Sequence, residues 1–461
     1  MSLRSQVMRG GVYLALRQGL GMVISLGGVL LLTRTIGPDQ YGIYTAVYSL
    51  FWYLQTISQL GISVYLVRRE GQEEQKFIYD QGFTLLLLMA LSAVAIAFVG
   101  LPWIGQWVRL ESFQPVARTM LFTLPLVLVG QVGMAQLERK LDYRRVALIE
   151  LANQLMFYLV GLGCAFQGMG VWAPVAGWWA QQAQSVILLL WAARYRPQFH
   201  WDPKLIREML GYSVGFSASY WIWQARVLVN PLIVGRYAGA DAVGYIALAI
   251  RMVEVLGFVK GVTWRISIAA LARLQDDTER LRKAVNEGMG LQILAIGPLL
   301  VVLAIALPYL LPVMFGPEWL PVLSVFPFIA LSSLSNSLFN MHSSVLYVLK
   351  HNWHVSLFHL ANIVLFGGAA AVLVPRLGLV GYGWAEMVTL LSYCVIHYSL
   401  SKAVGSPDYR LAGVWWAGLS LGLFVYQLGW WTLIAVGAIA LLPQTHRQIK
   451  AYIHSLRSSK A

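Results

Sequence analysis

Long apolar segments separated by short polar stretches follow one another along the whole chain. Fourteen can be marked, at 9–35, 40–66, 80–101, 115–137, 146–167, 171–193, 208–235, 240–262, 287–312, 320–349, 354–374, 378–401, 411–427 and 429–443. As helices they are long enough to cross a hydrocarbon core of ~30 Å, with the last two at the short limit. The pattern predicts an all-α polytopic membrane protein with about fourteen transmembrane helices. Twelve is the alternative if the final pair lies in the membrane interface.

Composition supports the membrane class. The 461 residues are 58% hydrophobic and only 12% charged, which is half the ~25% that is typical of soluble proteins. Cys164 and Cys394 both lie inside apolar segments, without the spacing of a redox or metal motif, and are interpreted as packing residues. Arg17 interrupts the first apolar segment and no cleavage site follows, so this segment is expected to be a transmembrane helix and not a signal peptide.

The distribution of basic residues predicts the orientation of the chain. With alternating helices, 25 Lys and Arg residues fall on the side of the N-terminus and 5 on the other side. Cytoplasmic loops carry such an excess, so both termini are expected in the cytoplasm, in a cell inner membrane. The net charge of +14 therefore belongs to the inner membrane surface, and no nucleic-acid partner is expected.

A polar turn after the first segment returns later in the chain. "LLTRTIGPDQYGIYTAV" at 31–47 resembles "IVGRYAGADAVGYIALA" at 233–249. At a constant offset of 202 positions, Arg34, Gly37, Asp39 and Gly42 match Arg236, Gly239, Asp241 and Gly244. Because the repeat relates helix 1 to helix 7 in one orientation, it predicts two parallel six-helix lobes with a substrate site between them.

The expected organisation follows from this repeat. The N-terminal lobe covers 1–200 and the C-terminal lobe covers 201–405. Helices 13 and 14 occupy 406–443, and 444–461 forms a basic tail on the inner leaflet.

Three stretches carry a family resemblance. The stretch 30–68 holds Arg34, Gly37, Pro38, Tyr41 and Gly42, followed by Gly61-Ile62-Ser63, and it resembles the polysaccharide transporter, or O-antigen-type lipid-linked oligosaccharide flippase, family of the multidrug/oligosaccharidyl-lipid/polysaccharide (MOP) superfamily. "GMGVWAPVAGWWA" and "SNSLFNMHSSVLYVLKHN" are also similar, although Val348-Leu349 replaces the usual Gly-Arg of the latter.

The resemblance implies a flippase that moves undecaprenyl-diphosphate-linked oligosaccharide from the inner to the outer leaflet by alternating access. The implied partners are this glycan lipid and the membrane lipids, with a polysaccharide polymerase and export machinery as further candidates. No cofactor and no metal are implied.

Charged residues inside the predicted spans are the candidate substrate contacts. An Arg at the bilayer centre costs ~2.5 kcal/mol or more, so it is expected to face a cavity or a partner. Arg17, Arg226 and Arg251 could hold a diphosphate through their planar forks, with Glu254 one turn after Arg251. Gly21, Ser25 and Gly28 on the face of Arg17 leave room either for a cavity or for a tight helix contact. Lys260 is expected to snorkel to the inner surface.

The tenth predicted helix carries a polar stripe. Its members are Ser332, Ser333, Asn336, Ser337, Asn340, Ser343 and Ser344. Such a stripe either lines water or forms hydrogen bonds between helices, and Asn336 and Asn340 are its candidate substrate contacts. His342 lies off the stripe and is expected to be packed.

Two other functions would also suit a polytopic helical protein. A cation-coupled multidrug exporter of the same superfamily would bind organic cations through buried acids, but away from the span ends the only acids within spans are Glu150, Glu254 and Glu386. A membrane polysaccharide polymerase or ligase would need catalytic residues in a long outer loop, whereas the longest outer segment has about thirteen residues. The sequence favours a transporter of an anionic substrate, and not an enzyme.

The predicted topology can be tested by labelling single cysteines in a background that lacks Cys164 and Cys394. Positions 36–40 and 238–242 should react with an impermeant thiol reagent added outside, while the 194–208 link should be protected until the membrane is opened. Labelling of position 39 or 240 from the inside would contradict the two parallel lobes.

Overall fold

A computed structural model describes residues 3–68, 76–256, 271, 274–275, 277–448 and 450. Within these residues every regular element is a helix. The chain forms two compact units, Met1–Tyr245 (unit 1) and Ile246–Ala461 (unit 2). The all-α polytopic class is therefore confirmed. The units divide between Tyr245 and Ile246, whereas the expected lobes divide at 200, so the lobe boundaries stay a prediction based on helix order.

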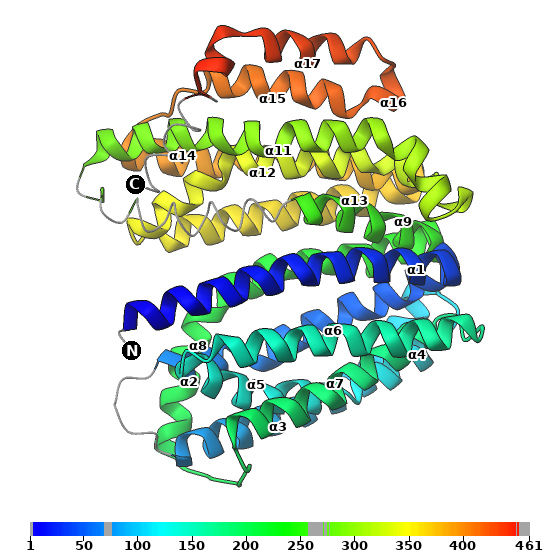
Figure 1. The fold of residues 1–461 in the computed structure, drawn as a ribbon, viewed down its shortest axis with the longest axis vertical. Helices are drawn as coiled ribbons and strands as arrows, with labels where there is room; N and C mark the ends of the chain where they lie inside the picture. Colours follow the sequence, from blue (N-terminus) through cyan, green and yellow to red (C-terminus); the bar gives the residue numbers. More distant parts are fainter. Residues whose placement is uncertain are drawn as a thin grey trace. The chain divides into compact units, whose positions relative to one another are not determined.

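Unit 1 is a bundle in which the long helices lie side by side (Figure 1). Its helices are α1 (Leu3–Gln59), α2 (Ile62–Arg68), α3 (Lys76–Val108), α4 (Phe113–Leu121), α5 (Leu124–Arg139), α6 (Tyr143–Phe166), α7 (Trp172–Ala193) and α8 (Pro203–Gln224). A 3-10 turn, η1 (Ala225–Leu228), and a π-helical turn, η2 (Asn230–Val234), then lead into α9 (Gly235–Leu256).

Unit 2 is a second helical bundle. Its elements after α9 are α11 (Thr278–Met314), η3 (Pro317–Trp319), α12 (Val322–Val348), α13 (Asn352–Thr389), η4 (Leu390–Ser392), α14 (Tyr393–Val404), α15 (Arg410–Leu423), α16 (Val425–Leu428) and α17 (Thr432–Leu441). Buried Trp319 and Trp415 are the largest side chains of its interior.

Each predicted apolar segment falls mainly on helix in its described part. Neighbouring segments can be continuous: α1 runs through 9–35 and most of 40–66 across a kink at Gly37, and α13 links two segments across Gly378. In the described part of the chain, seven helices are long and apolar enough to cross a membrane, and two of them, Leu16–Gln59 and Asn352–Val404, span two predicted segments each. The number of fourteen crossings stays a prediction.

The repeated turns have the same backbone conformation. Gly37 has φ 75° and ψ 171°, and Gly239 has φ 86° and ψ 177°. A positive φ combined with ψ near 180° is essentially restricted to glycine, which explains why both copies keep it. The offset of 202 positions therefore reflects a shared local structure.

The two turns also pack against each other within unit 1. A Cβ atom at Gly42 would collide with the carbonyl oxygen of Ala240, and a Cβ atom at Gly244 would collide with that of Pro38. The contact is reciprocal, because Ala240 lies at the same offset from Pro38 as Gly244 from Gly42. Such reciprocity is the signature of a local two-fold relation between the copies.

This contact places two carboxylates of the repeat near one another. Burial, and secondarily the negative charge of Asp39, raises the pKa of the Asp241 carboxyl. Because the pKa of Asp241 is higher in the folded state, the protonated carboxyl favours folding at low pH. This contribution to stability is lost as the pH rises through the folded-state pKa. Close packing at the glycines must therefore offset the cost of burying this carboxylate, to which the repulsion from Asp39 adds, at neutral pH.

Replacement of Gly42 by Ala should destabilise unit 1, because the added methyl group must push the two turns apart. The expected loss is about 1–3 kcal/mol, as for overpacking in other tight contacts, measured by thermal unfolding of the purified protein in detergent. Gly27→Ala is the matched control, since no atom lies within 4 Å of a Cβ at Gly27. It should be neutral or slightly stabilising. Equal melting temperatures for the two variants would contradict the contact.

Candidate functional site

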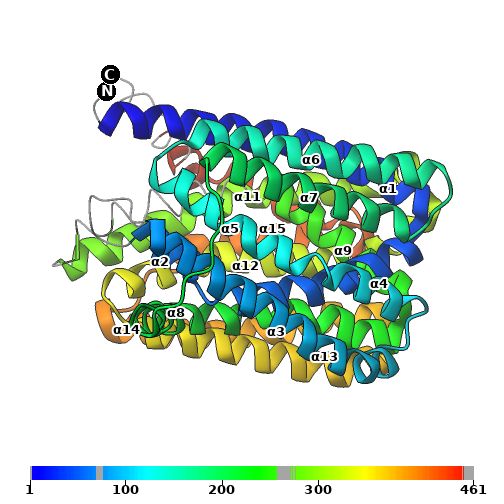
Figure 2. The ribbon, with the colours of Figure 1, turned by 90° about the horizontal axis from the view of Figure 1, so that it is seen from below.

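Arg17 is held by an acid on another helix of unit 1. Its Nε atom lies 2.8 Å from Oε2 of Glu150 on α6, and the two side chains are 33% and 30% exposed. A second N–H group of Arg17 donates to Gln18 at 3.0 Å. Helices α1 and α6 lie side by side in both views (Figure 1 and Figure 2). The pair satisfies a guanidinium that would otherwise be costly in a membrane helix.

The small-residue face of α1 closes on α6. Gln154 donates to the carbonyl oxygen of Gly21 at 2.7 Å, and the ring of Tyr158 occupies the space where Gly28 has no side chain. The Tyr158 hydroxyl donates to the carbonyl oxygen of Ser25 at 3.3 Å. Of the two outcomes that the sequence left open for this face, the structure shows the tight helix contact.

Arg226 lies where the helical geometry changes. It belongs to η1, between the regular helix α8 and the π-helical turn η2 that contains Pro231. Asn230 donates to the carbonyl oxygen of Val243 at 3.4 Å, and Trp221 to that of Thr56 at 3.2 Å. Short 3-10 and π segments inside a long helix frequently mark hinges or functional sites. The half-buried Arg226 thus lies on an irregular segment that neighbouring helices hold in place.

Unit 2 contains the charged pair that the sequence predicted. Arg251 NH1 lies 3.5 Å from Oε2 of Glu254, one turn away on α9, and the side chains are 42% and 60% exposed. Both groups are thus more accessible than the Arg17–Glu150 pair. Lys260 lies outside the described residues.

The polar stripe falls on α12, and part of it forms hydrogen bonds. Asn340 donates to the Oε1 atom of buried Gln292 on α11 at 3.3 Å. Ser337 and Ser344 donate to carbonyl oxygens of their own helix. Asn336 is half-buried. Gln292 Nε2 has no hydrogen-bond partner within the described residues, so the residue that contacts the stripe at Asn340 has an unused donor.

The structure thus brings together three pairs: Arg17 with Glu150, Arg251 with Glu254, and Asn340 with Gln292. Arg17 and Arg226 belong to unit 1, and Arg251, Glu254, Asn336 and Asn340 belong to unit 2. Their role as substrate contacts stays a hypothesis. In the described ranges, no group of three or more His, Cys, Asp or Glu side chains is arranged to hold a metal ion.

A polar cluster in unit 2 did not emerge from the sequence. The Tyr409 hydroxyl lies 2.5 Å from Nε2 of His342 and 2.7 Å from Nδ1 of His397. His342 is fully buried, as expected, but its partners come from α14 and from the link before α15. Burial raises the pKa of Tyr409, so the phenol stays protonated and can donate one hydrogen bond. Only the fold brings these three separated residues together.

Solved structures share this architecture. "Lipid II flippase MurJ, inward closed conformation" matches with a TM-score of 0.69 and 11% identity over 95% of this chain and 99% of that one. An inward-facing multidrug resistance MATE family transporter of the MOP superfamily matches with a TM-score of 0.64 and 15% identity, over 86% and 98%. The chain therefore shares the fold of these two transporters, and its long apolar helices identify it as a multi-pass membrane protein.

Sequence relatives specify the family. The lipopolysaccharide biosynthesis protein WzxC of Escherichia coli is 22% identical, over 89% of this chain and 84% of its own. The succinoglycan biosynthesis transport protein ExoT of Rhizobium meliloti is 23% identical, over 77% and 70%. The polysaccharide biosynthesis protein family matches residues 31–324, which is more than half of the chain, and the protein belongs to this family.

Replacement of Tyr409 by Phe should lower the stability of unit 2 by about 1–3 kcal/mol, because His342 Nε2 would be left buried without a partner. Thermal unfolding in detergent measures the loss. Tyr398→Phe is the control, since Tyr398 is exposed and its hydroxyl has no hydrogen bond to any residue that the structure describes. It should change stability by less than ~0.5 kcal/mol. If Tyr409→Phe behaved like Tyr398→Phe, the cluster would not contribute to stability.

Proposed function

We propose that the protein is a flippase that translocates lipid-diphosphate-linked oligosaccharide, the repeat unit of a polysaccharide, from the inner to the outer leaflet of the cytoplasmic membrane by alternating access. Both termini face the cytoplasm in this proposal. The family supports a role in polysaccharide biosynthesis, and the relative ExoT is described as a transport protein. An undecaprenyl-diphosphate-linked glycan is the proposed substrate, and a polymerase and export machinery are the proposed partners.

The observation that carries the proposal is the presence of guanidinium groups inside apolar helices. Arg17 and Arg251 each have a carboxylate partner, which makes it possible to hold the charge without substrate. Guanidinium has five N–H donors, and the contact of Arg17 with Glu150 uses its Nε atom. Further N–H groups stay available to phosphate oxygens, whose geometry matches the planar fork.

The same pairs argue against a cation-coupled multidrug exporter. Such a protein would present carboxylates to organic cations. Here Glu150 and Glu254 each face a guanidinium, and Glu386 is buried at 3% exposure. An organic cation would have to displace an Arg that is tethered by its own helix, so the sign of the charge favours an anionic substrate.

A membrane polymerase or ligase is also disfavoured. The link between α3 and α4 spans only residues 109–112, and the link between α6 and α7 only 167–171. These links offer little chain to build a catalytic centre outside the helices. We therefore propose a transporter and not an enzyme.

The decisive variants are Arg17→Ala and Arg251→Ala. Each is made singly and then together with a change of its acidic partner. If the arginines bind the diphosphate, each single variant should lower export about tenfold or more, because a charge-assisted contact contributes ~1.5–3 kcal/mol. Arg→Lys should restore part of the export, since it keeps the charge without the bidentate fork. The measurements are lipid-linked repeat units on the outer leaflet and the amount of folded protein in the membrane.

The double variants Arg17→Ala/Glu150→Ala and Arg251→Ala/Glu254→Ala separate binding from structural pairing. Removal of one partner leaves the other as an unpaired charge, whereas removal of both partners leaves no unpaired charge. Recovery of protein level without recovery of export supports the diphosphate contact. Recovery of both would show that the arginine served only its partner, and would refute the contact for that residue.

A further inference from the structure

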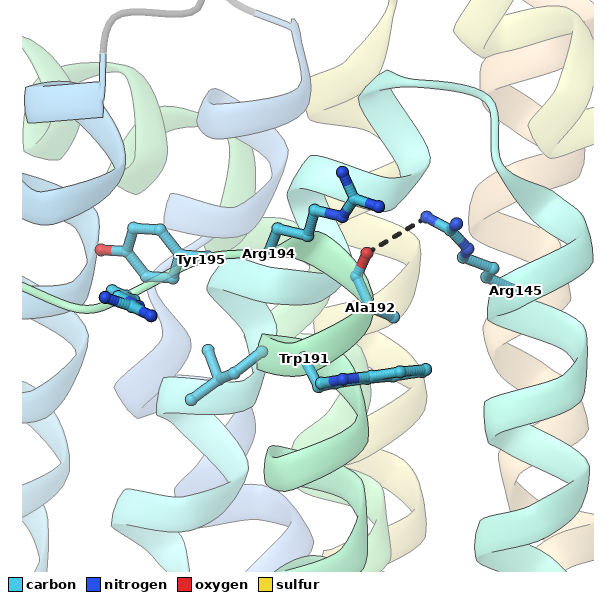
Figure 3. A pocket seen from close by; sticks show the side chains of 7 residues that line it. Arg145, Trp191, Ala192, Arg194 and Tyr195 are labelled. Carbon is cyan, nitrogen blue, oxygen red and sulfur yellow. Dashed lines mark hydrogen bonds between the residues drawn. The ribbon is translucent and has the colours of Figure 1, made fainter.

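A pocket of about 600 Å³ lies at the end of α7 in unit 1. Its lining consists of Arg145, Leu190, Trp191, Ala192, Arg194, Tyr195 and Arg196 (Figure 3). The close-up shows Arg194 above Ala192, Arg145 reaching toward the Ala192 carbonyl oxygen, and the ring of Trp191 below. Three arginines therefore line one pocket, although in the sequence they were only part of the basic surface charge.

Little negative charge balances this pocket. Arg145 pairs with Asp142 at 3.4 Å and donates to the carbonyl oxygen of Ala192 at 3.2 Å, which anchors it at the end of α7. Arg194 and Arg196 have no ion-pair partner in the part of the chain that the structure describes. The pocket is therefore lined by two arginines without an ion-pair partner in the described residues and by a third that is anchored, a set that suits an anion able to accept several hydrogen bonds.

The segment that carries Arg194 and Arg196 is held rigidly on α3. The Tyr195 hydroxyl donates to Oδ1 of Asp80 at 2.7 Å, and the backbone N–H of Gln198 donates to the same oxygen at 3.2 Å. Burial, together with the contact to Asp80, raises the pKa of Tyr195 and keeps the phenol a donor. Further along, the N–H of Asp202 donates to the Oε1 atom of Gln81 at 2.8 Å. The arginines are thus presented by a preorganised loop, which reduces the entropy lost on binding.

We propose that this pocket binds the phosphate head group of an anionic phospholipid of the inner leaflet. Trp191, which also lines the pocket, is 77% exposed, and Trp is enriched at the boundary between lipid and water. The pocket lies at the end of unit 1 that the distribution of Lys and Arg assigns to the cytoplasm, where anionic lipids give the membrane a negative surface. Its volume fits a head group.

The shared chemistry is a phosphate group, which a phospholipid or free phosphate could supply. The exposed indole favours the lipid, because free phosphate has no apolar part to contact it. The site does not depend on the transported substrate. The phospholipid site can therefore be refuted while the flippase proposal holds, and the flippase proposal can be refuted while the phospholipid site holds.

Thermal unfolding of the purified full-length protein in mixed micelles tests the proposal. Phosphatidylglycerol should raise the melting temperature by several degrees over phosphatidylcholine with the same acyl chains, since a ligand that binds only the folded state stabilises it. The shift should shrink with increasing NaCl. An equal shift with phosphatidylcholine, or with inorganic phosphate at matched ionic strength, would refute a phospholipid site.

Variants then locate the binding. Arg194→Asn and Arg196→Gln should each weaken phosphatidylglycerol binding by about tenfold. Asn is chosen at position 194 because Arg194 has φ 53°, a left-handed conformation that Asn tolerates. Arg144→Gln is the matched control, because exposed Arg144 precedes Arg145 but does not line the pocket. It removes the same charge and should bind like the wild type.

If Arg144→Gln weakened binding as much as the pocket variants, the effect would be general surface charge and the pocket would be refuted. Unchanged binding in both pocket variants would refute it as well. Should one of these variants fail to fold, Arg194→Lys and Arg196→Lys keep the charge and test the bidentate geometry. They should bind more weakly than the wild type but more tightly than the neutral variants.

Discussion

The interaction on which much of unit 1 depends is the pairing of a guanidinium with a carboxylate between two apolar helices. A charged side chain in hydrocarbon must find a partner or water. Arg17 finds Glu150, and the neighbouring glycines let Gln154 and Tyr158 approach α1 closely. The pair therefore aligns α1 with α6 while it keeps a positive group available at membrane depth. Under the proposed function, Arg17 would serve both helix packing and substrate binding.

The repeat contributes a second constraint. Gly37 and Gly239 adopt a conformation that other residues resist, and Gly42 and Gly244 let the two turns touch through their backbones. The requirement is steric, so it depends on the absence of side chains and not on any specific contact. A turn that merely joined two helices would not need these glycines in both copies.

Both proposals involve the binding of phosphate groups by arginine side chains. Arginines inside the helices suit a diphosphate in transit, and arginines at the end of α7 suit a resident lipid head group. The difference lies in their surroundings. Arg17 and Arg251 have acidic partners that a substrate must compete with or complement, whereas Arg194 and Arg196 have no ion-pair partner within the described residues. Reversible contact fits the first arrangement, and stable occupancy fits the second.

The sequence by itself determined the helical class, the positions of the apolar segments, the repeat and the family, because these depend on local periodicity and on short motifs. It also identified Arg17 and Arg251 as unusual, since charge inside an apolar run is visible without a fold. The Glu254 partner was predictable because it lies one helical turn from Arg251. Only the tertiary structure decided the partners Glu150, Gln292 and Tyr409, and the gathering of Arg145, Arg194 and Arg196. These groups are distant in sequence, and their contacts depend on how helices pack, which periodicity does not encode.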